Sequence, residues 1–371
     1  MKQRRVLRFV VPIIAVLITL VALEVALRVY HAATRPATVP VSQVAPVPLH
    51  IVTDAPYLYG LNPNHPDISS QGTRDDEVAI PKPKGTFRVL VLGDSIAYGS
   101  GIPKDKTFPN RLESSLRERL GSAEVVNAGV SGYSPYNELQ YYLAKGKEFE
   151  PDIVIVAFCM NDVVNPRLHW GDAPGVRFPD DAIPNHDYDV NHILPLIQKR
   201  EQEKQRSPSV LEHSELYRAL APRLSRLFAR KAETKVPTYI TGEDDISIEV
   251  LVDKSSPESR WLRTMYDRLG AAVAANGAKL VIVIFPLAYQ LDDNYPFMPQ
   301  KQLREYCDEK SIPCLDLLPS FRQQGKEKVF LLNKSPFYDI WHLTEAGHDL
   351  SVREIERFLG DQKLLPNKRS E

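Results

Sequence analysis

From Phe87 onward, short apolar runs alternate with amphipathic stretches. The first run covers residues 89–92 and ends at Gly93, and continuous runs of this length are typical of strands buried on both faces of a parallel sheet. Further strands are predicted at 124–126, 153–158, 279–285 and near Leu315, and helices at 108–120, 136–145, 261–275, 300–310 and after His342. Strands that alternate with helices form right-handed βαβ units. The pattern therefore predicts an α/β domain with a central parallel sheet.

The N-terminus has a different pattern, in which basic residues precede a long apolar stretch. Four cations, Lys2, Arg4, Arg5 and Arg8, come before residues 9–23, and the apolar character continues to Tyr30. A helix of about 20 such residues can span a bilayer, with the positive charges on the cytoplasmic side. We therefore predict a signal-anchor over residues 1–30 and a domain on the periplasmic or extracellular side. The alternative is a cleaved signal peptide, because small residues follow at Ala32 and Ala33, and the domain would then be secreted.

Composition divides the rest of the chain. Prolines among small residues in 31–56 favour an extended linker, and 57–86 reads as an irregular lead-in that lies over the core. An α/β domain is expected over 87–361, interrupted by an insertion at about 163–259 that is too long for a loop in a compact sheet. A helix-like stretch at 211–229 indicates a partly ordered cap. This insertion either shapes specificity as a lid or is a peripheral elaboration.

Charge and glycine spacing exclude several classes of function. The 371 residues carry 46 basic and 47 acidic side chains, a balance too even to recruit nucleic acid. The spacing of Gly93, Gly99 and Gly101 matches neither a P-loop nor a dinucleotide fingerprint. His342 and His348 are near each other, but no third metal ligand is evident, so no cofactor or metal is expected.

The three cysteines suit an exported protein without requiring a disulfide. Cys307 lies near the end of a predicted helix, and Cys314 lies at the start of the predicted strand that follows it. They are close enough in the chain to bridge in an oxidising compartment, and the sequence leaves that question open. Cys159 ends a buried strand, where a packed thiol is expected rather than a catalytic one.

Polar residues gather where the predicted strands end, which is where reactive groups meet in an open α/β sheet. Ser95, His342 and Asp339 supply a hydroxyl, a base and a carboxylate that can orient the base. Donors for a tetrahedral oxyanion are available from the backbone N–H of Ser95, the backbone N–H of Gly132 and the side-chain amide of Asn161. Each element by itself is a weak signal, since a Gly-Asp-Ser triplet after a strand can simply cap a helix. Their order and placement together favour a nucleophilic serine site.

Four blocks of the chain resemble those of the SGNH/GDSL hydrolase superfamily. They are GDS at 93–95, NAGVSG at 127–132, MND at 160–162 and DIWH at 339–342. The resemblance extends from about Phe87 to Leu359 and implies a flavodoxin-like three-layer α/β/α fold. It also implies a triad of Ser95, Asp339 and His342, with an oxyanion hole formed by Ser95, Gly132 and Asn161.

The resemblance extends to the closing helix and has one departure. It implies that Thr344 caps this helix and that His348 is structural. The third block commonly reads Gly-x-Asn-Asp, whereas this chain has Cys159 at the first position. Asp94 and Asp162 are expected to brace the backbone rather than take part in catalysis.

The expected activity is cleavage of acyl esters through an acyl-serine intermediate. Export favours a substrate at the cell envelope, so we expect O-acetyl esters of an envelope glycan. The alternatives are an O-acyltransferase on the same glycan class, a lipid esterase, and a non-catalytic, membrane-tethered binding module. Tyrosines that could stack on sugar rings follow the second block, but the role expected of them is packing of a helix against the sheet; they are Tyr133, Tyr136, Tyr141 and Tyr142.

Overall fold

The computed structural model describes residues 2–34, 47–163, 179–182, 214, 216–217, 251–292, 298–332 and 339–366. Contacts divide the chain into one unit of residues 1–46 and 198–237 and a second unit of residues 47–197 and 238–371. Residues 35–46 of the expected linker and most of the expected insertion, including nearly all of the predicted helix at 211–229, lie outside the described residues.

A five-stranded parallel sheet forms the centre of the second unit. Its strands are β3 (Phe87–Gly93), β4 (Ala123–Asn127), β5 (Ile153–Cys159), β6 (Lys279–Phe285) and β7 (Cys314–Asp316). Their spatial order is β4-β3-β5-β6-β7, which is the flavodoxin-like order, and every neighbouring pair is parallel. The apolar run 89–92 is fully buried, as expected for a central strand. The predicted α/β class and parallel sheet are thus confirmed.

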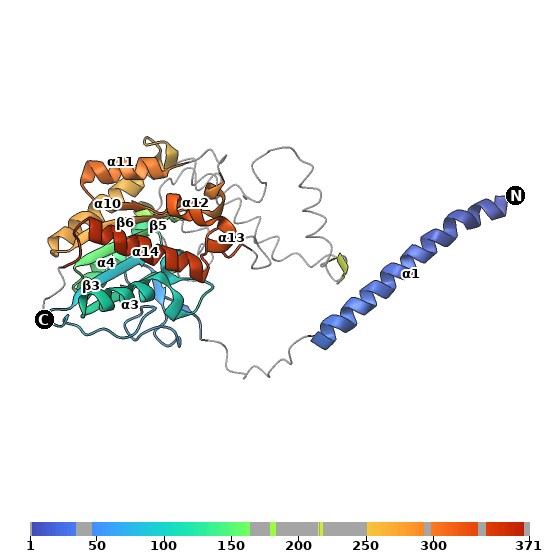
Figure 1. The fold of residues 1–371 in the computed structure, drawn as a ribbon, viewed down its shortest axis with the longest axis horizontal. Helices are drawn as coiled ribbons and strands as arrows, with labels where there is room; N and C mark the ends of the chain where they lie inside the picture. The colour runs from blue at the N-terminus through green and yellow to red at the C-terminus, as the bar shows by residue number, and fades with distance from the viewer. Residues whose placement is uncertain are drawn as a thin grey trace. The chain divides into compact units, whose positions relative to one another are not determined.

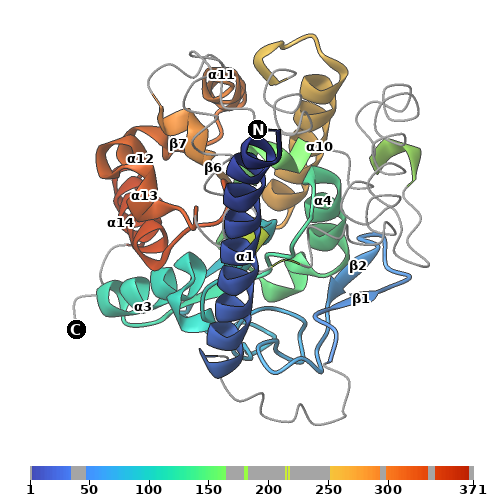
Figure 2. The ribbon, with the colours of Figure 1, turned by 90° about the vertical axis from the view of Figure 1, so that its right-hand side faces the viewer.

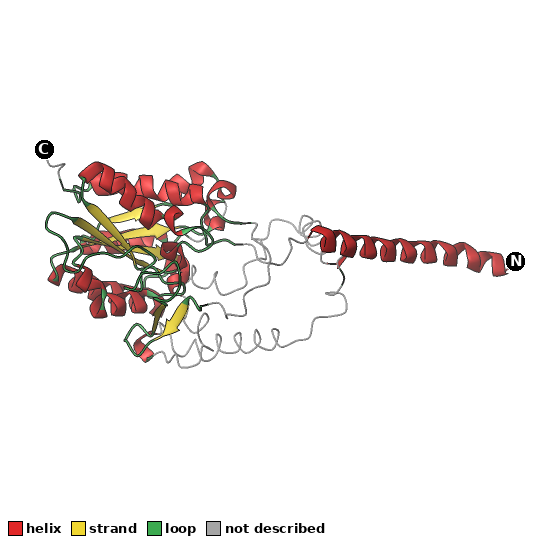
Figure 3. Ribbon diagram, turned by 90° about the horizontal axis from the view of Figure 1, so that it is seen from below, coloured by secondary structure: helices red, strands yellow, loops and turns green. Residues whose placement is uncertain are grey.

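Helices cover both faces of this sheet (Figures 1 and 3). α3 (Phe108–Leu120) packs with α14 (Glu345–Asp361), whereas α4 (Pro135–Ala144) packs with α10 (Pro257–Ala275). α11 (Gln300–Lys310) contacts β7. The short helices are α2 (Ser95–Tyr98), α12 (Leu318–Gln324) and α13 (Lys326–Val329). Single 3₁₀ turns occur at Lys104–Lys106, Gly146–Phe149, Met160–Val163, Asp180–Ala182 and Ala288–Leu291.

α10 begins earlier than the hydrophobic pattern predicts. The pattern places its start at Trp261, inside the stretch expected to follow the insertion, but the helix already begins at Pro257. The Ser256 side chain accepts a hydrogen bond from the Ser259 N–H and so caps the first turn. Proline at the first helical position supports the same start, because its φ is already helical.

Two short strands were not predicted, one in the expected linker and one in the lead-in. β1 (His50–Val52) and β2 (Tyr59–Leu61) form an antiparallel pair (Figure 2). β2 is buried along its whole length, and the Tyr59 carbonyl accepts a hydrogen bond of 2.7 Å from the Tyr133 hydroxyl. Strands of three residues are too short to show a period, so sequence patterning could not find them.

The predicted N-terminal helix is present as α1 (Lys2–Thr34), with an ion pair of 2.8 Å between Glu24 and Arg28. Among the helices of the described residues, none is both long and apolar enough to cross a membrane. The helical part of the prediction for residues 1–30 is therefore confirmed, and the membrane-spanning part is not supported.

The cysteines are free thiols. Cys159 is fully buried in β5, in agreement with a packed thiol. Cys307 in α11 and Cys314 in β7 are hydrogen-bonded to each other and are not bridged. Burial and this hydrogen bond raise the pKa of the Cys314 thiol, which disfavours the thiolate.

Candidate active site

Ser95 lies at the carboxyl end of β3, where the chain turns directly into α2. The side chain of Asp94 caps this helix by accepting a hydrogen bond of 2.8 Å from the Ile96 N–H. The second block follows β4, and its Val130 N–H donates to the Gly93 carbonyl at 3.0 Å. Gly129 leaves no room for a side chain, since an added Cβ would collide with the backbone N of Tyr98. The first two blocks are therefore in direct backbone contact.

Asp339 and His342 lie on the loop that precedes α14. The Ile340 carbonyl accepts a hydrogen bond of 3.0 Å from the Ala288 N–H, and the His342 carbonyl accepts one of 2.9 Å from the Leu331 N–H. Backbone contacts to two other segments thus fix the loop in place. These contacts hold the backbone from which the imidazole projects.

The three predicted triad residues form a continuous hydrogen-bonded relay. His342 Nε2 lies 2.9 Å from Ser95 Oγ, and His342 Nδ1 lies 2.8 Å from Asp339 Oδ2. The other carboxylate oxygen, Asp339 Oδ1, accepts hydrogen bonds from the backbone N–H groups of Trp341 and His342. Burial alone would raise the pKa of Asp339, but its hydrogen bonds and its attraction to His342 outweigh burial and lower that pKa. An ionised Asp339 can hold the imidazole with its Nε2 free to accept the serine proton.

The structure describes the conformation and contacts of two of the predicted oxyanion donors. Gly132 has a φ of 79°, a left-handed conformation that favours glycine. Asn161 follows β5 in a 3₁₀ turn, and its Nδ2 donates a hydrogen bond of 3.1 Å to Asp94 Oδ2. An amide nitrogen carries two hydrogens, so the second N–H of Asn161 remains for a substrate oxygen. The Asp94 carboxylate therefore connects the Asn161 amide to the helix that begins at Ser95.

Cys159 stands where the third block commonly has glycine, and a hydrogen bond to Asp162 holds its backbone. The Cys159 N–H donates a hydrogen bond of 2.8 Å to Asp162 Oδ2, which closes the turn that presents Asn161. Burial and the charges of Asp94 and Asp162 raise the pKa of the Cys159 thiol well above its usual value. The predicted bracing role of the two aspartates agrees with these contacts, because each accepts a backbone N–H.

A carboxyl that the sequence did not single out lies behind the site. Glu138 on α4 is fully buried, and its pKa is raised from a usual 4.5 to about 8 by burial and by the charge of Asp94. Burial also raises the pKa of Asp162 well above its usual value, together with the charges of Asp94 and Glu138. A protonated Glu138 limits the negative charge around Asp94 and Asp162. In the sequence, the only signal for Glu138 is its position on an otherwise apolar face of a predicted helix, and that signal is weak.

We expect Glu138→Gln to make stability less sensitive to alkaline pH. The unfolded carboxyl ionises near pH 4.5, whereas the folded one keeps its proton up to about pH 8. Because the unfolded chain releases its proton first, stability falls as pH rises through this interval. The neutral amide removes that loss, so the variant should gain at least about 2 kcal/mol relative to wild type between mildly acidic and alkaline pH. Denaturant unfolding across this range measures the difference, and parallel pH profiles of the two proteins would contradict it.

Thr344 and His348, which were predicted to be structural, cap a helix and pack in the core. Thr344 caps α14 by accepting a hydrogen bond of 3.1 Å from the Gly347 N–H. His348 is buried against the ring of Phe108, and its Nδ1 accepts a hydrogen bond from the Phe108 N–H at 3.0 Å. Burial lowers the pKa of His348 to about 3, so it remains neutral. The four tyrosines after the second block are all buried, in agreement with packing of α4.

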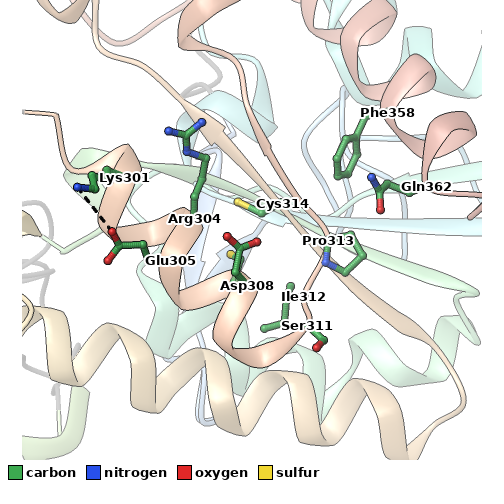
Figure 4. A pocket seen from close by; sticks show the side chains of 11 residues that line it. Lys301, Arg304, Glu305, Asp308, Ser311, Ile312, Pro313, Cys314, Phe358 and Gln362 are labelled. Atoms are coloured by element: carbon green, nitrogen blue, oxygen red, sulfur yellow. Dashed lines mark ion pairs between the residues drawn. The ribbon is translucent and has the colours of Figure 1, made fainter.

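A cavity in the described part of the chain lies away from these residues. It has a volume of about 600 Å³ and is lined by α11, the start of β7 and the end of α14 (Figure 4). Its wall includes Arg304, Cys314 and Phe358. Because residues 311–313 precede β7, this cavity is at the amino end of the strand, whereas Ser95 follows the carboxyl end of β3. It is therefore not part of the candidate site.

Comparison with known proteins identifies the family. The model of the GDSL-like Lipase/Acylhydrolase family matches residues 91–350, a range that contains all four blocks. An arylesterase of Vibrio mimicus is 32% identical over 75 residues, which cover 20% of this chain and 38% of that protein. The chain thus spans well under two thirds of that relative.

Solved structures with related folds are more distant in sequence. TesA shares 14% identity, with a TM-score of 0.40 over 75% of this chain and 99% of that one. A catalytic mutant of the acetylxylan esterase Axe2 from Geobacillus stearothermophilus shares 12% identity, with a TM-score of 0.40 over 77% of this chain and 99% of that one. The family match covers most of the chain, and on that ground this protein belongs to the GDSL-like lipase/acylhydrolase family.

Proposed function

We propose that this protein is a serine esterase that cleaves acyl esters through an acyl-serine intermediate. The observation that carries the proposal is the relay from Asp339 through His342 to Ser95, with contacts of 2.8 and 2.9 Å. In this mechanism His342 takes the serine proton as Oγ attacks the ester carbonyl, and it then returns the proton to the departing alcohol. Water, activated by the same imidazole, hydrolyses the acyl-serine.

The substrate class that we propose is an O-acetyl ester of a cell-envelope glycan. Related structures include an acetylxylan esterase and an esterase active on acetylated mannans, and these names suggest where to begin a screen. A transferase would form the same intermediate and pass the acyl group to a sugar hydroxyl, while a lipid esterase would prefer longer acyl chains. Comparison of acetylated glycans, long-chain esters and added sugar acceptors separates these activities.

We also propose that the domain lies on the outer side of the plasma membrane. The proposal rests on the basic residues that precede the apolar N-terminal stretch, and α1 places this stretch in one helix. A reporter that is active only in the periplasm, fused after Glu371, should be active. Activity confined to a cytoplasmic reporter would overturn the proposal.

The role of Asn161 can be tested separately. If its free N–H stabilises the oxyanion, Asn161→Ala should lower kcat by about 10² to 10³ with little change in KM. Asn276→Ala is a matched control, because that amide also donates a hydrogen bond but lies exposed at the end of α10. Rates on an activated acetyl ester provide the measurement. Equal losses in the two variants would exclude Asn161 from the oxyanion hole.

The first experiment is labelling of the whole protein with a fluorophosphonate, which reacts with activated serines. We expect wild type to be labelled and His342→Ala to be labelled far more slowly, because the hydroxyl then lacks its base. A folded wild type that resists labelling would contradict the esterase proposal and favour a binding module that has kept the fold. Circular dichroism establishes that both proteins are folded.

A further inference from the structure

A buried arginine from the lead-in lies against the turn that follows the nucleophile helix. Arg74 is 4% exposed, and its guanidinium donates hydrogen bonds of 2.7, 2.8 and 2.9 Å to the carbonyls of Tyr98, Gly99 and Ile102. The same guanidinium lies 4.2 Å from the centre of the Tyr98 ring. Arg74 therefore contacts both the last residue of α2 and the turn beyond it.

The backbone around Arg74 holds the second block as well. The Arg74 N–H donates a hydrogen bond of 3.0 Å to the Asn127 carbonyl, and the Asn127 N–H donates one of 3.1 Å to Asp75 Oδ2. Asn127 is the last residue of β4, and its side-chain oxygen accepts the Gly129 N–H at 3.1 Å. Two adjacent lead-in residues thus contact the end of the helix that begins at Ser95 and the start of the second block.

The nucleophile helix needs external support because it is very short. α2 has four residues and ends at Gly99, which adopts a left-handed conformation. A helix of this length makes too few internal hydrogen bonds to hold its own geometry, and its last carbonyls lack partners within the helix. The Arg74 guanidinium supplies donors to the carbonyls of Tyr98 and Gly99. Without them, the backbone N–H of Ser95 would have more freedom to move.

We propose that Arg74 is a positioning residue for the reaction, acting through the turn that presents Ser95 and the turn that presents Gly132. This inference rests on the proposed esterase function, since it assigns these backbone N–H groups to the oxyanion. Misplacement of reacting groups by about 1 Å can cost about 10²-fold in rate even when the altered residue is remote. The lead-in is then part of the catalytic apparatus, although none of its residues contacts the relay.

Arginine suits this position better than lysine. Its planar fork can direct separate N–H groups to three carbonyls, whereas an ammonium is a compact point charge on a flexible stem. The charge is partly balanced by Asp67, 3.9 Å away, and by the face of Tyr98. Arg74→Lys therefore keeps the charge and loses the geometry.

A second buried arginine provides the matched control. Arg88 is fully buried, and it donates hydrogen bonds of 2.6 and 2.9 Å to the carbonyls of Phe149 and Ala79 and one of 2.7 Å to Glu124. It lies near the amino end of β3, at the opposite end of this strand from Ser95. Arg88→Lys should cost stability as Arg74→Lys does, without a specific effect on the site.

The experiment compares Arg74→Lys and Arg88→Lys in the full chain. We expect Arg74→Lys to lower kcat on an activated acetyl ester by about 10- to 100-fold at nearly unchanged KM, and Arg88→Lys to lower it less than about threefold. Hydrogen exchange followed by mass spectrometry should show faster exchange in 95–102 and 127–132 for Arg74→Lys alone. Equal kcat losses in the two folded variants, or unchanged exchange in Arg74→Lys, would overturn the inference.

A second variant and a measurement that needs no activity complete the test. If Arg74→Lys does not fold, Asp75→Asn tests the neighbouring contact by which the lead-in holds the second block. Asp75 Oδ1 accepts the Asp76 N–H and the Asn110 amide while Oδ2 accepts the Asn127 N–H, so either orientation of an asparagine places two donors against each other. Faster exchange of 127–132 supports the inference, and wild-type exchange there overturns it. Hydrogen exchange needs no activity, so an inactive wild type would defeat the esterase proposal while this structural contact is still tested.

Discussion

Ser95→Ala is expected to lower ester cleavage by about 10⁶-fold and to abolish fluorophosphonate labelling without unfolding the protein. Ser95 Oγ is the atom that faces His342 Nε2 at 2.9 Å, and alanine removes it completely. The fold should tolerate the change, because the cap of α2 comes from Asp94. Rates on an activated acetyl ester and the thermal midpoint measure the two effects.

The control for this variant is Ser114→Ala on α3. The Ser114 hydroxyl is exposed, donates a hydrogen bond of 3.2 Å to the Asn110 carbonyl, and belongs to none of the four blocks. Its activity and labelling should equal those of wild type. Residual cleavage by Ser95→Ala at more than about one hundredth of the wild-type rate would show that another group performs the chemistry.

Asp339→Asn should lower kcat by about 10⁴-fold, and the structure gives the reason. The Asp339 Oδ1 atom accepts two backbone N–H groups, from Trp341 and His342, so an asparagine would keep its carbonyl oxygen there. Its NH₂ group would then face His342 Nδ1, which must become the acceptor. The imidazole proton would move to Nε2, where it blocks removal of the serine proton. Steady-state rates measure the loss.

Asp316→Asn is the matched control for that change. Like Asp339, Asp316 is a carboxylate whose Oδ1 accepts a backbone N–H, here that of Leu318 at 3.0 Å. It is the last residue of β7 and does not contact the imidazole. Its activity should remain within about threefold of wild type. If Asp339→Asn is equally active, His342 works without a carboxylate partner and the relay is a dyad.

The sheet could be predicted because its signal is local. Each of the long strands is an uninterrupted apolar run such as 89–92, and burial on both faces requires that pattern whatever the neighbouring strands are. The predicted helices at 108–120 and 300–310 likewise agree with α3 and α11. The pair β1 and β2 was missed because three residues carry no period, and its partners are specified only by tertiary contacts.

The candidate site could be predicted in part because parallel strands bring their carboxyl ends to one edge. This rule holds for Ser95 and Asn161, which follow β3 and β5, whereas His342 lies on the loop that precedes α14. The structure adds the distances, including the contact between Asn161 and Asp94 that no spacing rule contains. The order of strands in space, which places β5 beside β3, is likewise a property of the folded chain.

By itself, the sequence determined the class of fold, the chemical groups of the relay and their order along the chain, since these depend on local pattern and residue type. Only the tertiary structure decided the surroundings of these groups. Arg74 lies in an irregular stretch and Glu138 on an ordinary helix, and neither has a local signature. Their importance comes from burial and from partners distant in the chain, Tyr98 for one and Asp94 for the other, and such contacts exist only once the chain has folded.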